Sequence, residues 1–437
     1  MRKEEIMKKT ELNDSYKTDF RYPQASGLET TLPDASRSRA WIEISRSALR
    51  HNTAYLQSLL PKHCALMPVV KANAYGHGAG LVARELNTMG IHSFCVACVS
   101  EGVALRRQQI AGEILVLGYT HPDQFPLLDQ YALTQTVVDR DHALALNAYA
   151  CRASRPGPLC PNTDEKGKPA PSPLPVHIAV DTGMHRLGEP AEHLSRIREI
   201  FSLPGLRITG LYSHLAAAGG TDPASRDYTL EQISAFYRLT ARLGIRGNPV
   251  TDSSGRHCPP PRLHIQASYG ILRYPMPDMD CARPGIALYG LLSSAADMGP
   301  YADKLRPVLS LRARVAAIHQ LSPGQSAGYD MAYTAARPTT VATVAIGYAD
   351  GLPRILSEGR GTVLLHGRQA PVVGRICMDQ LLADVTSIPQ TRPGDIATLI
   401  GQDGQESVSA ADLADACGTI TNELLCCLGP RLERLLL

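Results

Sequence analysis

Eight short apolar runs, most of them separated by a helical pattern, constrain the fold of this 437-residue chain more than any other feature. The runs are 65–70, 92–97, 114–117, 134–138, 176–180, 208–212, 263–267 and 284–289. Helical periodicity occurs between them at 81–86, 103–110, 193–201 and 230–243. Eight strands with intervening helices over roughly this length are typical of a (β/α)8 TIM barrel. A doubly wound sheet alternates in the same way, but no G-x-G-x-x-G follows the first run, so the barrel is favoured.

The pattern changes after about residue 295 into strand-like runs joined by tight Gly and Pro turns. These runs are 308–317, 340–347, 362–365, 372–376, 381–385 and 396–400, followed by two short helical patterns at 410–416 and 422–428 and a last strand at 431–437. We therefore predict an α/β protein, with an N-terminal (β/α)8 TIM barrel over residues 40–294 and a C-terminal mostly-β domain over residues 295–437.

Three segments fall outside this organisation. Residues 1–39 are polar, rich in turn formers and without periodicity, so we expect a disordered N-terminal extension. Residues 154–175 and 246–262 are rich in Pro, Gly and Ser and bury too little apolar area to offset chain entropy. Because apolar runs resume directly after each of them, both are predicted to be surface loop insertions.

The composition excludes several classes of function. The net charge of +3 is small and the basic residues are scattered, so neither nucleic acid nor an anionic membrane is an expected partner. No stretch approaches the roughly 20 apolar residues that span a bilayer, and the N-terminus lacks the apolar core of a secretory signal. The 11 cysteines include one C-x-x-C, Cys95–Cys98, but no second pair or spaced histidines complete a metal set. Free thiols without an export signal predict a cytoplasmic protein with no bound metal.

Residues able to do chemistry gather at the ends of the predicted barrel strands. Lys71 follows the first run, Arg186 lies in the loop after the fifth, and His214 follows the sixth. Ser268 comes just after the seventh run, and Arg283 precedes the eighth. Active sites of such barrels lie at the carboxyl ends of the strands. A single histidine or arginine at a strand end is often structural, but five such residues at one end predict an active site.

The most informative of these residues is Lys71, in the segment VVKANAYGHG (69–78). A lysine at the end of a buried strand loses hydration, which frees its amine for Schiff-base chemistry. The segment resembles the cofactor-lysine motif of the alanine racemases, which use pyridoxal 5′-phosphate (PLP). Further blocks match that family in order, namely VDTGMHRLG (180–188), GLYSHLA (210–216), ARPGIALYGL (282–291), AGYDMAYTA (327–335), VAIGYADG (344–351) and VVGRICMDQ (372–380). The resemblance covers nearly all of residues 40–437.

The resemblance implies a fold-type III PLP enzyme that acts on a small amino acid as a head-to-tail homodimer with shared active sites. Lys71 would hold PLP and act as the base on one face of the substrate Cα. Tyr329 of the partner subunit would be the base on the opposite face, and Tyr348 resembles the tyrosine at the family's active-site entrance. The residues that would bind the phosphate are Tyr75, Ser268, Gly285 and Ile286.

The remaining roles implied by the resemblance concern charge around the substrate and the cofactor ring. Arg283 would face the pyridine nitrogen, and His214 would link Arg283 to Tyr329. Arg186 would contact the cofactor phenolate oxygen and the substrate carboxylate. The backbone N–H of Met378 would help to seat that carboxylate.

Four places depart from the family pattern. Ala179 stands where many members carry a lysine modified to a carbamate, and the tail 428–434 lacks a tyrosine that often contacts the phosphate. Ala267 replaces the usual asparagine, and Gly219 stands where the entrance often has an aspartate. These changes leave the racemase chemistry intact but weaken the case for strict alanine specificity. A roomier pocket could take serine, because one hydroxyl in a small pocket changes selectivity by only about 1–3 kcal/mol.

The favoured interpretation is a racemase that interconverts L- and D-alanine by a two-base mechanism and supplies D-alanine for peptidoglycan synthesis. A serine or broad-specificity amino-acid racemase remains a close alternative. A PLP-dependent amino-acid decarboxylase shares the fold, but its C-terminal cysteine motif is absent here. A barrel-only PLP carrier is a third class, which the β domain bearing Tyr329 and Met378 argues against.

Overall fold

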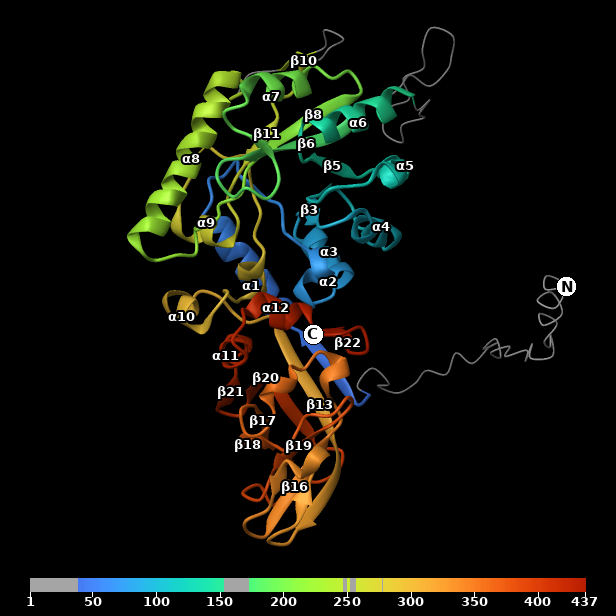
Figure 1. The fold of residues 1–437 in the computed structure, drawn as a ribbon, viewed down its shortest axis with the longest axis vertical. Coiled ribbons are helices and arrows are strands. Elements are labelled where there is room, and N and C mark those ends of the chain that lie inside the picture. Colours follow the sequence, from blue (N-terminus) through green and yellow to red (C-terminus); the bar gives the residue numbers. More distant parts are fainter. Residues whose placement is uncertain (1–37, 153–172, 247–249, 252–256, 277) are drawn as a thin grey trace, which may run out of the picture. The chain divides into compact units, whose positions relative to one another are not determined.

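The structure is a computed structural model that describes residues 38–152, 173–246, 250–251, 257–276 and 278–437. Within these ranges, eight parallel strands form the barrel of the N-terminal region (Figure 1). They are β2 (Ala65–Leu66), β3 (Ser93–Val96), β4 (Glu113–Val116), β5 (Thr134–Val137), β6 (Leu174–Asp181), β8 (Leu206–Tyr212), β11 (Arg262–His264) and β12 (Cys281–Ala282). Six pair in the order β11-β8-β6-β5-β4-β3, and β12 pairs with β2. Single bridges, Val69–Cys95 and Ala267–Arg283, join the two sets and close the ring.

Helices connect successive strands and surround the barrel, as Figure 1 shows. They are α3 (Ala79–Thr88), α4 (Val99–Arg107), α5 (Phe125–Gln130), α6 (Arg140–Arg152), α7 (Leu194–Phe201), α8 (Pro223–Leu243) and α9 (Ser268–Arg273). Helix α8 begins after Asp222, whose carboxylate accepts a hydrogen bond from the N–H of Ser225. It ends at Gly244, which adopts the left-handed conformation that glycine tolerates best. The TIM barrel predicted from the sequence is confirmed.

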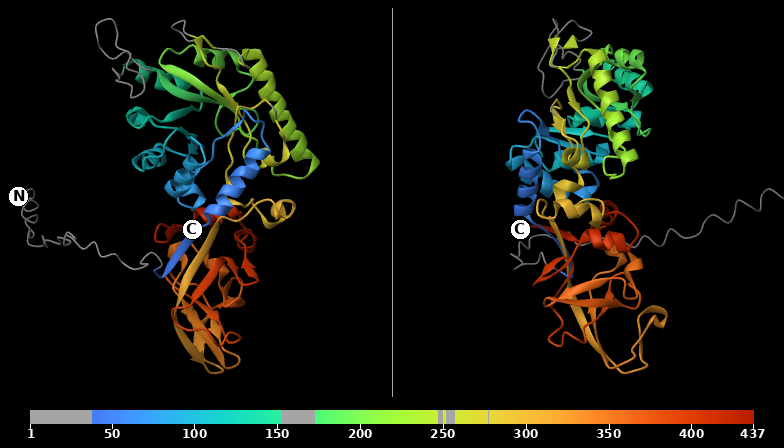
Figure 2. Two further views of the ribbon diagram at one scale, coloured as in Figure 1. Left: turned by 180° about the vertical axis from the view of Figure 1, so that it is seen from behind. Right: turned by 90° about the vertical axis from the view of Figure 1, so that its left-hand side faces the viewer.

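The eighth barrel strand was predicted over 284–289, and this detail is wrong. Strand β12 is only Cys281–Ala282, and residues 286–289 form the 3-10 helix η2 (Ile286–Tyr289). Helix α1 (Arg46–Ser58), blue in Figure 2, packs against η2. All four η2 residues are buried, and a short apolar run does not distinguish a strand from a buried helical segment. Arg283 therefore follows the last strand instead of preceding it, which places it at the carboxyl end of the barrel.

The C-terminal region is built on a nine-stranded sheet among the described residues, in the order β21-β20-β17-β18-β19-β16-β13-β1-β22. Its strands are β1 (Ala40–Ile44), β13 (Leu309–Leu321), β16 (Thr339–Val344), β17 (Thr362–Leu365), β18 (Arg368–Val373), β19 (Leu381–Asp384), β20 (Ile396–Asp403), β21 (Glu406–Val408) and β22 (Glu433–Leu436). A hairpin of β14 (Ser326–Ala327) and β15 (Tyr333–Thr334) projects from it, and α11 (Ala410–Ala416) and α12 (Thr421–Cys426) precede β22. The predicted mostly-β region is confirmed.

Strand β1 belongs to this sheet, although the sequence pattern predicts that residues from 40 onward belong to the barrel. It pairs antiparallel with β13 and parallel with β22, so that Ile42 lies opposite Leu311 on one side and Arg434 on the other. Just before it, Arg39 was counted with the disordered extension, but its guanidinium donates hydrogen bonds to Ala345 and Asp350. The chain therefore enters the C-terminal sheet before it enters the barrel.

Residues 1–37 of the predicted extension and most of the two Pro-rich segments lie outside the described residues. In the second segment, the backbone of β9 (Val250–Thr251) pairs antiparallel with β10 (His257–Cys258). The nine cysteines whose side chains the structure describes are free, and Cys64, Cys95 and Cys281 are buried. None of the described helices combines the length and apolar character that crossing a bilayer requires.

Candidate active site

A pocket of about 420 Å³ lies at the carboxyl ends of the barrel strands. Eight predicted site residues line it: Lys71, Tyr75, Arg186, His214, Ser268, Arg283, Gly285 and Ile286. Tyr348, predicted at the entrance, is not among the lining residues. Tyr329 and Met378 are not part of it. Asn422, on α12, brings the C-terminal region to the edge of the pocket.

The backbone after Lys71 makes a left-handed turn, α2 (Lys71–Tyr75). Ala72, Asn73 and Ala74 have φ values of 50°, 53° and 56°, and Tyr75 follows at 52°. This conformation costs an L-residue roughly 1–2 kcal/mol, so surrounding contacts must hold it. The N–H of Ala72 donates to Glu101 Oε1 at 2.6 Å, and the side-chain oxygen of Asn73 accepts from the N–H of Ala79 at 2.9 Å.

A buried histidine supports this turn from below. His77 Nδ1 lies 3.0 Å from the carbonyl oxygen of Ala74 and 2.9 Å from that of Tyr75. Burial lowers the pKa of His77 to about 4, so the ring is neutral and stacks on Tyr289 with a centroid distance of 4.3 Å. Tyr289 in turn donates to the carbonyl of Val69 at 2.9 Å. The ends of the turn are thus tied to the barrel and to η2.

Hydroxyl and backbone N–H groups of Ser268, Tyr75 and Gly285 lie close together in the same pocket. Ser268 Oγ accepts from the N–H groups of Gly285 at 3.0 Å and Ala287 at 3.2 Å. Tyr75 lies so close to Gly285 that a Cβ there would be 2.7 Å from the phenol oxygen. Hydroxyl and backbone N–H groups in this arrangement suit an oxyanion such as a phosphate.

Arg283 is 3% exposed, and protein groups hold its guanidinium on several sides. It hydrogen-bonds His264 Nδ1 and donates to the carbonyl of Ser213 at 2.7 Å. The guanidinium also lies over the ring of Tyr212, 4.8 Å from its centre. Among the described residues, no carboxylate pairs with it, so Arg283 carries a positive charge into the pocket.

His214 lies beside Arg283, with Nδ1 3.5 Å from a guanidinium nitrogen. Burial and the charge of Arg283, followed by the charges of Arg186 and Lys71, lower the pKa of His214 to about 3. The imidazole is therefore neutral near pH 7, and the positive charge of this part of the pocket comes from the arginines. Because the guanidinium only donates, His214 Nδ1 accepts and its ring proton sits on Nε2.

Arg186 is exposed in the loop after β6. Asp181 organises this loop by accepting from the N–H groups of Gly183 at 2.8 Å and His185 at 3.0 Å. The pocket wall near it includes Ala179, which is buried. Arg186 forms no ion pair within the described ranges, so its charge is open to a ligand.

Tyr329 and Met378 lie on the surface of the C-terminal region. Their side chains are 65% and 52% exposed. Left-handed residues flank the tyrosine, with φ of 76° at Gly328 and 55° at Asp330, and Asp330 forms an ion pair with Arg375. A single chain therefore does not bring Tyr329 to Lys71.

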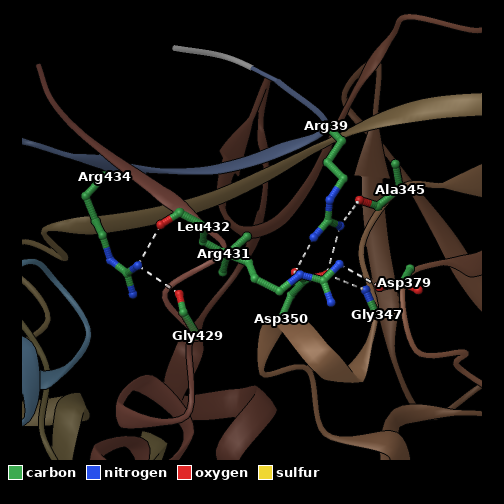
Figure 3. Close-up of polar contacts among 9 residues, drawn as sticks. All are labelled: Arg39, Ala345, Gly347, Asp350, Asp379, Gly429, Arg431, Leu432 and Arg434. Carbon is green, nitrogen blue, oxygen red and sulfur yellow. Dashed lines mark hydrogen bonds and ion pairs between the residues drawn. The ribbon is translucent and has the colours of Figure 1, made fainter. Parts of the chain in front are cut away.

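A buried carboxylate, Asp350, fixes the turn that carries Tyr348. Figure 3 shows its contacts with Gly347 and with two arginines. Asp350 is fully buried and accepts hydrogen bonds from the N–H of Gly347 at 3.0 Å and from Arg39 Nη1 at 2.9 Å. Arg431 Nε lies 3.4 Å from the same carboxylate and binds Asp379 at 2.6 Å. This cluster joins the start of the described chain, the Tyr348 turn and the tail.

The tail also reaches the loop of Lys71. Arg434 donates to the carbonyl oxygen of Gly76 at 3.0 Å and to those of Gly429 and Leu432, the last two visible in Figure 3. At Gly76, a Cβ would lie 2.2 Å from the carbonyl oxygen of Leu425. The C-terminal region therefore packs directly on the backbone next to Lys71.

Comparison with known families decides what this combination represents. The family model described as alanine racemase, N-terminal domain, matches residues 44–293, and the model of the C-terminal domain matches residues 308–436. The chain belongs to the alanine racemase family. The match to both domains favours this family over the decarboxylases and the barrel-only carriers.

Relatives of the family agree over most of the chain. The chain is 37% identical to alanine racemase from Halothermothrix orenii, over 90% of this chain and 96% of that protein. It is 39% identical to an amino-acid racemase from Enterococcus faecalis and 38% identical to serine/alanine racemase from Enterococcus gallinarum, each over 90% of this chain, but it spans only about half the length of either. Alanine racemase from Clostridium difficile 630 is a similar solved structure, with a TM-score of 0.79 and 31% identity over 92% of this chain and 96% of that one.

Alanine racemases depend on PLP, and the residues present here fit that cofactor. A similar structure, alanine racemase from Bartonella henselae, carries covalently bound pyridoxal phosphate, with a TM-score of 0.73 and 28% identity over 92% of this chain and all of that one. The pocket offers an amine at Lys71, a phosphate cradle at Ser268 and Gly285, and a buried donor at Arg283. A Schiff base, a phosphate and a ring nitrogen would need partners of these three kinds.

Sequence reasoning missed several supporting residues. Glu101 holds the turn after Lys71, and Arg39 and Arg434 tie distant segments to Asp350 and Gly76. None of them lies in a motif that predicts such a contact. Asp350 also caps the turn of Tyr348, because its carboxylate accepts a hydrogen bond from the N–H of Gly347.

Proposed function

We propose that this protein is a PLP-dependent racemase that interconverts L- and D-alanine by a two-base mechanism. The observation that carries the proposal is the convergence of Lys71, Arg283 and Ser268 on one pocket at the carboxyl end of the barrel. Membership of the alanine racemase family supports it, and so does the similarity to alanine racemase from Halothermothrix orenii over nearly its full length.

Lys71 binds PLP and moves the Cα proton on one face of the substrate. PLP, when bound, withdraws electrons from Cα and so makes its proton acidic. The left-handed turn after Lys71, held by Glu101 at Ala72, gives the side chain a fixed origin. A fixed origin favours catalysis because a positioned base needs little reorganisation to reach its proton.

Arg283 sets the electronic state of the cofactor ring, and the phosphate end is bound by Tyr75, Ser268, Gly285 and Ile286. A guanidinium stays charged and only donates hydrogen bonds, so opposite the pyridine nitrogen it suits an unprotonated ring. An aspartate in that place would keep the nitrogen protonated and strengthen electron withdrawal. The weaker withdrawal with Arg283 limits return of the proton to the wrong carbon, and therefore limits transamination.

A second copy of the chain supplies the other base in this proposal. Tyr329 and Met378 are exposed and lie outside the pocket of their own chain, which supports a role in the pocket of a neighbour. We propose a head-to-tail homodimer in which Tyr329 of the partner subunit acts on the face of Cα opposite Lys71. His214, neutral and with its proton on Nε2, links Arg283 to that tyrosine.

The substrate carboxylate is bound by Arg186 and by the backbone N–H of Met378 of the partner subunit, and Tyr348 lines the entrance. Arg186 lines the pocket, and none of the described carboxylates forms an ion pair with it, so its charge suits this role. The substitution of Ala179 for the usual lysine, together with the similarity to serine/alanine racemase from Enterococcus gallinarum, makes serine the second candidate substrate. We further propose a cytoplasmic protein that supplies D-alanine for peptidoglycan synthesis, without nucleic acid or membrane partners.

The test is a chiral assay of the purified protein with PLP, using L-alanine and L-serine side by side in deuterated solvent. Racemisation with solvent deuterium incorporated at Cα is expected, with alanine as the faster substrate and no release of CO₂. Equal rates on both amino acids would move the assignment to a broad-specificity racemase. Release of CO₂ without a D-product would contradict the proposal.

A further inference from the structure

A row of contacting polar side chains crosses the interior of the barrel below the pocket. It begins with Glu113 and Arg262, the first residues of β4 and β11, which form an ion pair. Glu113 Oε1 lies 3.4 Å from His177 Nε2, and His177 Nδ1 lies 2.9 Å from His264 Nε2. His264 Nδ1 then binds Arg283 at the carboxyl end of the barrel. This row of side chains thus joins the amino ends of the strands to the active-site pocket.

The donors of Arg283 fit only one arrangement of protons on His264 and His177. A guanidinium only donates, so His264 accepts at Nδ1 and carries its proton at Nε2. That proton faces Nδ1 of His177, which accepts it, so His177 carries its own proton at Nε2, facing the carboxylate of Glu113. Burial, followed for His264 by the charge of Arg283, lowers the pKa of both histidines, which keeps the rings neutral.

The neighbouring residues hold both rings in place. A Cβ at Gly210 would lie 2.5 Å from His177 Nδ1, so the bare backbone of β8 makes room for that ring. Tyr212 stacks on His264 with a centroid distance of 4.9 Å and an interplanar angle of 10°. Neither ring is free to turn away, and only the positions of their protons can change.

Glu113 is the carboxylate at the far end of this row of side chains. Arg283 has no carboxylate partner within the described ranges, and a buried cation without one is costly. Burial raises the pKa of Glu113, but its contacts with His177 and with Arg262 outweigh burial and hold that pKa below its ordinary value. Glu113 is therefore ionised at neutral pH and presents an acceptor oxygen 3.4 Å from His177 Nε2.

We propose that Glu113 is a positioning residue, which fixes Arg283 from the opposite end of the barrel by setting the proton positions on His177 and His264. Glu113 touches neither substrate nor cofactor. With its carboxylate present, Arg283 keeps an acceptor at His264 Nδ1. Without it, the proton of His264 can move to Nδ1 and face the donors of Arg283. The kinetic consequence rests on the proposed racemase function, but the proton positions do not.

The test is nitrogen-15 NMR of histidine-labelled holoenzyme, with the His264 signals assigned from a His264→Gln variant. In the wild-type protein, His264 and His177 are expected to be neutral with a bare Nδ1 and a protonated Nε2. In Glu113→Gln, the amide oxygen is expected to face Arg262 and the NH₂ group to face His177, which reverses the required proton positions. The His264 signals should change, and kcat should fall roughly 10-fold, because the contact between His264 and the charged Arg283 is lost.

Two matched controls separate this role from a structural one. Arg262→Gln breaks the same ion pair but leaves an oxygen acceptor for His177, so the histidine signals and kcat should change less than in Glu113→Gln. Glu85→Gln removes another buried carboxylate, which pairs with Arg50 and touches none of Glu113, His177 and His264. This variant should leave the histidine signals unchanged. Unchanged His264 signals in Glu113→Gln would overturn the proposal. If that variant does not fold, a protonated Nδ1 on His264 in the wild-type protein would overturn it alone, whether or not the protein is a racemase.

Discussion

Because Gly285 has no side chain, Tyr75 and Ser268 can both lie next to it in the proposed phosphate site. A Cβ there would lie 2.7 Å from the Tyr75 oxygen, so Gly285→Ala should push the phenol away from the phosphate position. Losing one hydrogen bond to a charged group should raise the Kd for PLP roughly 10-fold, measured by titrating the apoprotein. Gly299→Ala is the control, because nothing lies within 4 Å of a Cβ at that position. Equal PLP affinity of the two variants would show that the cradle is wrongly located.

A second prediction at this scale concerns His77 and the pH dependence of stability. Its pKa is about 4 in the folded chain, against an ordinary value of 6.5, because the ring is buried. Between these values the unfolded state binds more protons, so the free energy of unfolding falls as the pH drops from 6.5 to 4. The stability advantage of wild type over His77→Gln should therefore shrink by roughly 3 kcal/mol across that window, followed by urea unfolding. A constant difference would mean that His77 is solvated.

The two elements that the sequence analysis misplaced, η2 and β1, show where local patterns lose their information. Residues 286–289 are apolar because they are buried under α1, and burial alone does not specify a strand. Strand β1 lies directly before α1 in the chain, yet it pairs with β13 and β22 from the other end of the sequence. Strand partners separated by more than 250 residues leave no mark on a local pattern. The remaining barrel strands were predictable because each is a short apolar run with a helix close before it and close after it in the sequence.

Asp350 is predicted to stabilise the turn that carries Tyr348, because its carboxylate lies between Arg39 and Arg431. Asp350→Asn leaves Arg39 and Arg431 beside an uncharged, buried amide. The full cost of breaking a buried pair is reduced here by solvent at the two arginines, so we expect a loss of roughly 2 kcal/mol in the free energy of unfolding. Asp379→Asn removes an exposed partner of Arg431 and should cost less than about 1 kcal/mol. Equal losses would contradict the central role of Asp350.

At the scale of the whole molecule, the pocket was predictable from motifs, but its supports were not. Lys71, Ser268 and Arg283 lie in short segments whose residue types carry the chemistry, so the sequence identifies them directly. Arg434 supports Gly76 across 358 positions of the chain, and its partner is a backbone carbonyl, which any residue offers. Side chain to backbone contacts of this kind have no pattern in sequence and appear only when the two regions are folded together.

The last prediction also belongs to the whole molecule, and it tests the proposal that two copies of the chain share each active site. Lys71→Ala and Tyr329→Phe should each be inactive alone, because every site then lacks one base. In a homodimer that exchanges Tyr329, a mixed dimer contains one site with both bases and one with neither. Random reassembly of equal amounts should therefore restore about a quarter of wild-type activity. Mixing Lys71→Ala with the double variant Lys71→Ala/Tyr329→Phe should restore no activity, because neither protein supplies Lys71 and no complete site can form. If native mass spectrometry finds mixed dimers that remain inactive, then Lys71 and Tyr329 do not act on one substrate from two chains.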